Sequence, residues 1–116
     1  MKRTEMVKKS KDFQSIINYK HFYKNKYFVI YASKPDNTFL KPKFGIAVGK
    51  ALGDAVNRNL MKRRVRNIID NNKILFPNNH NYIIMIKRTS KEAKFSELNE
   101  ALSSLIKEIK WKKIIK

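Results

Sequence analysis

The sequence of 116 residues contains no cysteine, and it has only 9 acidic residues against 27 lysines and arginines. The absence of cysteine excludes disulfide bonds and metal sites built on thiolates. No stretch approaches the roughly 18 consecutive apolar residues typical of a transmembrane helix. The first residues also lack the apolar run of a signal peptide. We therefore expect a soluble, cytoplasmic protein.

The acidic residues are scattered as well as few. The aspartates are spread along the sequence: Asp12, Asp36, Asp54 and Asp70. A protein nuclease needs paired carboxylates around a metal, or a histidine with a partner acid or base. The two histidines, His21 and His80, are isolated in the sequence, and no glycine-rich phosphate loop is present. We therefore expect no catalytic side chain and no metal site in this chain.

The excess of basic residues gives a formal net charge of +18. Self-repulsion destabilises a compact state unless a polyanion is present, so nucleic acid is the first partner to consider and an acidic membrane the second. Some lysines can reflect an AT-rich genome, because lysine, asparagine and isoleucine are abundant together. Arginine is the cleaner indicator, since its planar guanidinium binds phosphates and bases in a bidentate manner. Four of the six arginines fall between positions 58 and 66.

The apolar pattern predicts a single domain over residues 1–116, because the chain is too short for two cores. We expect helices over residues 10–19, 54–72 and 95–110 and strands over residues 27–32, 44–48 and 82–86, with an additional short strand near residue 22. Ser10 and Asp54 are the expected N-caps of the first two helices. Residues 82–86 are almost entirely apolar, which predicts a central strand buried on both faces. The order α-β-β-α-β-α, extended by the additional strand, predicts an α+β sandwich with its helices on one side of a small sheet.

The helix expected over residues 54–72 has two different faces on an ideal helical wheel. Its apolar arc consists of Met61, Val65, Ile68 and Ile69. The neighbouring arc carries four cations and an amide: Arg58, Asn59, Lys62, Arg63 and Arg66. Arg64 falls outside both arcs. One face is therefore expected to pack on the sheet while the other is free to bind a ligand.

A solvated surface is the alternative interpretation of this basic face. Solvated helix faces usually mix charges of both signs, whereas Arg58, Lys62 and Arg66 are spaced four apart, which costs a few tenths of a kcal/mol per like-charged pair. No acid lies between Asp54 and Asp70 to offset them. RNA phosphates and bases would supply the missing negative charge, so we interpret the face as an RNA-binding surface.

The same region carries a long and order-specific pattern. Residues 45–66 read Gly-Ile-Ala-Val-Gly-Lys-Ala-Leu-Gly-Asp-Ala-Val-Asn-Arg-Asn-Leu-Met-Lys-Arg-Arg-Val-Arg. This stretch resembles the signature of the bacterial ribonuclease P protein subunit, in which a strand, a lysine and a glycine precede Ala-Val-x-Arg-Asn-x-x-Lys-Arg-x-x-Arg. Residues 8–14, 27–31 and 82–88 also resemble elements of that family, so the resemblance extends over essentially the whole chain.

The resemblance implies a left-handed β-α-β crossover around the basic helix, the opposite of the common hand. It further implies that the chain assists a catalytic RNA, which uses bound Mg²⁺ to cleave precursor tRNA and release its 5′ leader. The basic helix, with Lys50 at its entry, would contact that RNA. The single-stranded leader would lie in a cleft between the first helix and the sheet. The expected partners are therefore ribonuclease P RNA and leader-bearing precursor tRNA, with neither DNA nor a membrane.

The cleft residues of the family match this chain only in part. Phe13 and Tyr31 match aromatic positions, where an unstacked base gains about 1–3 kcal/mol by stacking. Ile17 stands where the family often has an aromatic residue, and it offers apolar contact without stacking. Packing of an amphipathic helix explains Phe13 and Ile17 equally well. Two further departures are Leu60, in place of the second arginine of the usual Arg-Asn-Arg triplet, and Ala51, in place of a second lysine. On the helical wheel Leu60 falls on the far side from Arg58, so we expect it to lie outside the RNA-binding face.

Three other classes of protein share some of these features. A ribosomal protein is also small and basic, but it is not expected to carry the Ala-Val-x-Arg-Asn-x-x-Lys-Arg pattern. A DNA-binding module would need two helices joined by a short turn, whereas strands flank the basic helix here. A membrane-surface helix would need one wide apolar face of its own, whereas the apolar residues here are shared among three helices and a sheet.

Overall fold

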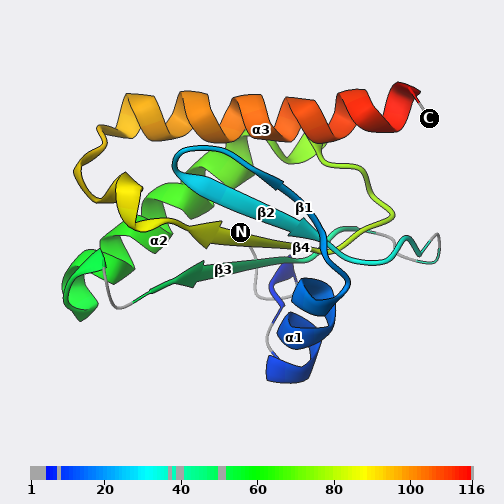
Figure 1. Cartoon of the computed structure of the whole chain (residues 1–116), viewed down its shortest axis with the longest axis horizontal. Coiled ribbons are helices and arrows are strands. Elements are labelled where there is room, and N and C mark those ends of the chain that lie inside the picture. Colours follow the sequence, from blue (N-terminus) through cyan, green and yellow to red (C-terminus); the bar gives the residue numbers. More distant parts are fainter. Residues whose placement is uncertain (1–4, 8, 37, 39–40, 50–51, 116) are drawn as a thin grey trace.

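The computed structural model describes residues 5–7, 9–36, 38, 41–49 and 52–115, with side chains described as far as residue 109. The elements in chain order are α1 (Ser10–Asn18), β1 (His21–Lys24), β2 (Phe28–Ala32), β3 (Phe44–Val48), α2 (Ala55–Asn71), η3 (Lys73–Leu75), β4 (Tyr82–Ile86), η4 (Arg88–Glu92) and α3 (Phe95–Ile115). Figure 1 shows them as one α+β domain. The predicted order is confirmed, and the additional strand near residue 22 is β1.

The four strands form one sheet in the order β1-β2-β4-β3. β1, β2 and β4 pair antiparallel, whereas β3 and β4 pair parallel. The parallel pair is joined by α2, and in Figure 1 both strands run to the left while α2 passes behind them on the way up from β3 to β4. This crossover is left-handed, as the family resemblance implied. The apolar strand β4 is central, as its sequence predicted.

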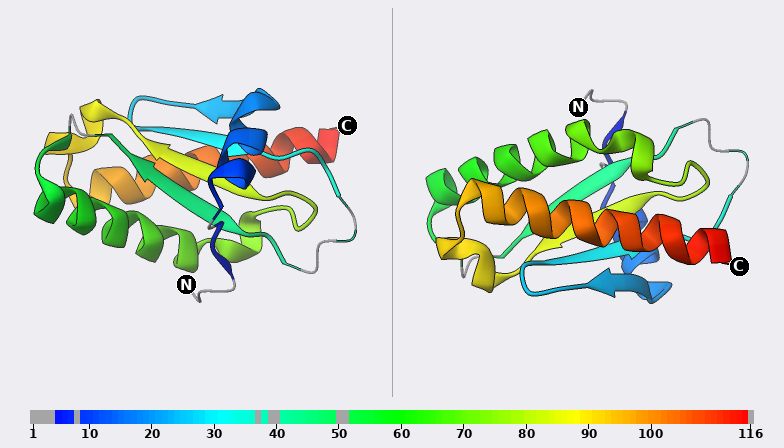
Figure 2. Two further views of the ribbon diagram at one scale, coloured as in Figure 1. Left: turned by 90° about the horizontal axis from the view of Figure 1, so that it is seen from below. Right: turned by 90° about the horizontal axis from the view of Figure 1, so that it is seen from above.

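Alternation along the strands sends apolar side chains to both faces of the sheet. On the larger face, Phe28 and Ile30 of β2 and Ile84 of β4 pack into the main core with α2 and α3. On the opposite face, Ile83 forms a smaller cluster with Val7 and Ile16, against which Phe13 and Tyr31 also pack. Figure 2 shows α1 standing apart from the α2–α3 layer. The prediction that all helices share one side of the sheet is therefore wrong for α1.

The entry to α2 is fixed by two residues. Asp54 is the N-cap, and its side-chain oxygen accepts a hydrogen bond from the Asn57 N–H at 2.9 Å. Gly53 has a φ of 114°, a conformation that a residue with a Cβ rarely adopts. The predicted cap at Asp54 is confirmed. The predicted cap at Ser10 is wrong, because Ser10 is already helical and Lys9 precedes α1 without a side-chain cap.

Gly45 permits the close contact between α1 and the sheet. A Cβ built at Gly45 would lie 2.6 Å from Phe13 Cζ and 2.6 Å from Ile83 Cδ1. Both distances are far below van der Waals contact, so the ring of Phe13 rests on the backbone of β3. At Gly49, by contrast, a Cβ would meet nothing within 4 Å in the described structure.

These two glycines provide a matched pair of variants. Gly45→Ala should lower the free energy of unfolding by about 1–3 kcal/mol, because the added methyl group overpacks Phe13 and Ile83. Gly49→Ala should be neutral or should stabilise by about 0.4–1 kcal/mol, since it only restricts the unfolded chain. Urea unfolding measures both. Equal stabilities of the two variants would contradict the close contact between Phe13 and β3.

Candidate RNA-binding surfaces

The apolar side of α2 is buried, and its basic side lines a depression. Met61, Val65, Ile68 and Ile69 are buried in the main core, as the helical wheel predicted. The depression has a volume of about 570 Å³, and its lining residues are Val56, Asn59, Leu60, Lys62, Arg63 and Arg66. Four of the five predicted residues on the basic arc are thus brought together. Arg58 is half-buried on the same helix but does not line the depression.

The acids nearest to α2 are engaged elsewhere. Asp54 caps the helix, and Asp70 pairs with Lys73 at 3.2 Å. Lys73 also pairs with Glu5 at 2.6 Å, and the hydrogen bond from Lys73 to Glu5 raises the pKa of the lysine. As far as the described residues extend, no carboxylate pairs with any of the five cations of α2 between positions 58 and 66.

Two of these arginines also have a buried hydrogen-bond donor without an acceptor. The Nε atoms of Arg58 and Arg66 are buried and have no hydrogen-bond acceptor among the described residues. A buried donor without an acceptor costs free energy, and a charged donor costs more than a neutral one. An incoming phosphate oxygen would satisfy such donors and neutralise the charge at the same time. The electrostatics of α2 therefore favour a polyanionic ligand.

Arg64 lies on the other flank of α2, as its wheel position predicted. It lines a separate depression of about 160 Å³, with Leu52, Leu60 and Met61 nearby and Lys91 contributed by η4. The side chain is half-buried rather than fully exposed to solvent. Lys50 and Ala51, the two sequence positions at the helix entry, lie outside the described residues. The predicted contact of Lys50 with RNA therefore stays a prediction.

The predicted cleft residues lie on the α1 side of the sheet. Phe13 and Tyr31 are half-buried and share the smaller cluster with Ile83. Ile17 is half-buried on α1, but it is not one of the apolar residues packed in that cluster. The structure thus brings Phe13 and Tyr31 together and leaves Ile17 at their margin.

Phe22 is an aromatic residue of this surface that sequence reasoning missed. It pairs with Tyr31 across β1 and β2, and the two ring centroids lie 5.7 Å apart. Its side chain is 45% exposed. The segment around it has no clear period in the sequence, so only the strand register could have shown that Phe22 stands beside Tyr31. The α1 side of the sheet therefore carries three aromatic rings that a base could contact, those of Phe13, Phe22 and Tyr31.

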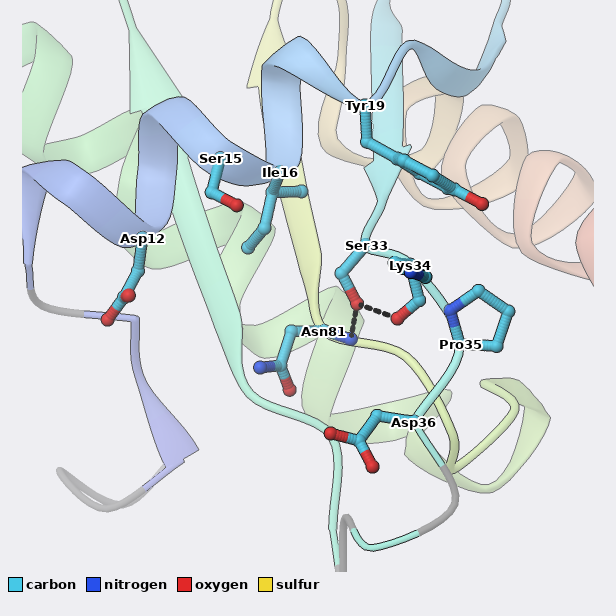
Figure 3. Close-up of a pocket in the computed structure, with 9 residues that line it drawn as sticks. All are labelled: Asp12, Ser15, Ile16, Tyr19, Ser33, Lys34, Pro35, Asp36 and Asn81. Atoms are coloured by element: carbon cyan, nitrogen blue, oxygen red, sulfur yellow. Dashed lines mark hydrogen bonds between the residues drawn. The ribbon is translucent and has the colours of Figure 1, made fainter.

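Figure 3 shows an acidic depression beside α1. It has a volume of about 520 Å³, and its charged lining residues are Asp12 of α1, Lys34 and Asp36. Ser33 Oγ accepts a hydrogen bond from the backbone N–H of Asn81 at 2.8 Å, which joins two of the segments that line the depression. Hydrogen bonds from Thr38 lower the pKa of Asp36, which keeps its carboxylate ionised. The two carboxylates outnumber the single ammonium group of Lys34, so this depression is less favourable for RNA phosphates than the basic side of α2.

The two histidines are not isolated, contrary to the sequence interpretation. Their ring centroids lie 5.9 Å apart, and His80 Nδ1 is 2.7 Å from the Ser33 carbonyl oxygen. His80 is 8% exposed, and His21 Nε2 is 2.9 Å from the Tyr23 hydroxyl oxygen. Among the described residues, no three histidine, aspartate or glutamate side chains are grouped so that they could hold a metal ion.

Comparison with known proteins identifies the family. The Ribonuclease P family model matches residues 1–110. The ribonuclease P protein component of Mycoplasma capricolum subsp. capricolum is 41% identical over 95% of this chain and 100% of its own length. That of Mesoplasma florum is 37% identical over 91% of this chain and 96% of its own length. These relatives do not favour the ribosomal alternative.

Solved structures give the same result. A mutant of the RNase P protein of Staphylococcus aureus superposes with a TM-score of 0.83 at 28% identity, covering 93% of this chain and 90% of that one. The RNase P protein from Thermotoga maritima gives a TM-score of 0.79 at 26% identity, covering 90% of this chain and 96% of that one. Within the described residues, no helix is both long and apolar enough to cross a membrane. The chain belongs to the family of ribonuclease P protein components, subunits of an endoribonuclease.

Proposed function

We propose that this subunit binds ribonuclease P RNA through the basic side of α2 and thereby helps the RNA to remove the 5′ leader of precursor tRNA. The observation that supports this role most strongly is the uncompensated charge of α2. Lys62, Arg63 and Arg66 share one depression, and no described acid pairs with them. Phosphates neutralised by such cations release counterions, which supplies much of the affinity of proteins for nucleic acids.

The α1 side of the sheet is the proposed surface for the single-stranded leader. Phe13, Phe22 and Tyr31 are all partly accessible there. Exposed rings bind successive bases by stacking with little sequence preference, as a leader of variable sequence requires. Ile17 would add apolar contact at the margin. The carboxylates of Asp12 and Asp36 would repel the phosphates of the leader from the acidic depression beside α1.

The protein's contribution to chemistry is proposed to be electrostatic. The catalytic Mg²⁺ ions would be held by the RNA subunit and the substrate. Added positive charge lowers the repulsion between RNA phosphates that Mg²⁺ must otherwise screen. The subunit would therefore reduce the Mg²⁺ concentration needed for cleavage. We expect this assembly to act in the cytoplasm.

Reconstitution tests the proposed function. A bacterial ribonuclease P RNA should be assayed at low Mg²⁺ with and without this protein, on precursor tRNA carrying either a long leader or a single leader nucleotide. The protein should increase kcat/KM for both substrates, and more strongly for the long leader. No increase for either substrate would contradict the proposed function.

Phe13→Leu tests the leader surface in the same assay. Leucine keeps apolar volume against β3 but loses the stacking face, so the preference for the long leader should fall about tenfold. Cleavage of the substrate with one leader nucleotide should change little. Phe95→Leu is the matched control, because Phe95 is 40% exposed at the start of α3, away from this surface. Equal effects of the two variants would remove Phe13 from the leader surface.

A pair of arginine variants tests the RNA-binding side of α2. Arg63→Ala should weaken binding to the RNA subunit and flatten the slope of log K against log salt by about one unit, the effect of one lost phosphate contact. Arg64→Ala removes the same charge from the other flank of the helix and should change the slope less. Binding titrations over a range of salt concentrations measure both. A slope left unchanged by Arg63→Ala would mean that Arg63 does not contact phosphate.

A further inference from the structure

Two apolar side chains lie exposed inside the basic depression of α2. Val56 is 74% exposed and Leu60 is 40% exposed, and both line the depression together with Asn59, Lys62, Arg63 and Arg66. They are four residues apart, so they are neighbours on one helix face. The helical wheel had placed Leu60 outside the RNA-binding site. In the structure, however, Leu60 and Arg63 border the same depression.

Exposed apolar residues are common when they occur singly, and such residues need no special explanation. Here the two residues are adjacent and lie among cations. This combination differs from a protein-docking patch, which concentrates apolar surface and carries few charges at its centre. It suits a ligand that has flat apolar faces and a negatively charged backbone, which is the chemistry of a nucleotide.

The pairing state of the nucleotide follows from the geometry of RNA. In a paired A-form helix the base faces are stacked on one another, and the major groove is too deep and narrow for side chains to enter. Aliphatic side chains therefore reach a base face only where the base is unpaired and turned out of its stack. Arg63 lies in the same depression, and a guanidinium plane can cover the second face of such a base.

We infer, on the basis of the proposed function, that Val56 and Leu60 form an apolar step that receives one unpaired nucleobase of the RNA subunit. Asn59 beside the step can hydrogen-bond to the edge of the base. Lys62 and Arg66 contact the flanking phosphates. In this chain Leu60 thus makes an apolar contact at the position where the family usually has an arginine. Burial of apolar surface releases no counterions, so the contribution of the step is independent of salt.

The double variant V56A/L60A tests this inference in the full-length protein bound to a ribonuclease P RNA. Loss of the apolar contact should weaken binding about tenfold at every salt concentration. The slope of log K against log salt should stay the same, in contrast to Arg63→Ala. Alanine is a good helix former, and both positions are exposed, so thermal unfolding should show an intact fold.

Ile74→Ala is the matched control, because Ile74 is 89% exposed on η3, beyond the opposite end of α2. It should leave binding unchanged. Dimethyl sulfate probing of the RNA provides a second readout. The wild-type protein should protect an unpaired adenine or cytosine that becomes reactive again in the complex with V56A/L60A.

The possible outcomes separate this inference from the proposed function. If the wild-type protein does not bind the RNA, both fall. If the wild-type protein binds and V56A/L60A binds equally well, the inference that Val56 and Leu60 receive a base is wrong, while the proposed function stands. A weakened affinity with a flattened salt slope would also overturn the step, because it would show that the substitutions disturb phosphate contacts instead. Binding weakened equally by Ile74→Ala would overturn it too.

Discussion

The packing of the apolar side of α2 against the sheet determines which side chains of this helix face outward. Met61, Val65, Ile68 and Ile69 are buried in the main core, so the helix cannot turn about its own axis without exposing them. Each fully buried aliphatic side chain contributes about 1.5–3 kcal/mol to folding. This burial fixes the outward direction of the basic side. The cations are therefore held in place by the apolar contacts of the neighbouring side of the same helix.

The acids at the two ends of α2 do not neutralise its basic side. The acid at each end of α2 has a structural partner, since Asp54 caps the helix and Asp70 pairs with Lys73. Neither is free to neutralise the arginines between them. A protein that folds with this much unrelieved repulsion gives up stability in the free state and recovers it when a polyanion binds. We therefore expect the subunit to be more stable when it is bound to RNA than when it is free.

The sequence predicted those features that depend on local periodicity. The wheel of α2 separated the buried arc correctly, the cap at Asp54 was recognised by residue type, and the apolar run of β4 marked the central strand. Other features depend on long-range geometry. The position of α1 on the opposite face follows from which side of the sheet Ile83 points to, and periodicity alone does not carry that information.

Two neighbouring pairs of side chains were missed for the same reason. Phe22 stands beside Tyr31, and His21 beside His80, because of strand register and loop closure rather than closeness in sequence. Leu60 was assigned to the far side of α2 because its angle was measured from Arg58, whereas on the same wheel it lies only about 60° from Arg63. The left-handed crossover could be expected only from the family resemblance, since the common rule gives the opposite hand.

We expect the outward side of α2 to face the RNA, and the absence of cysteine permits a direct measurement. A single cysteine can be introduced at Asn67, exposed on α2, or at Ser104, exposed on α3, and labelled with an iron chelate that generates hydroxyl radicals. The probe at position 67 should cleave the RNA subunit strongly at a few neighbouring nucleotides, while the probe at position 104 should cleave it weakly. Equal cleavage from both positions, or stronger cleavage from position 104, would show that the outward side of α2 does not face the RNA.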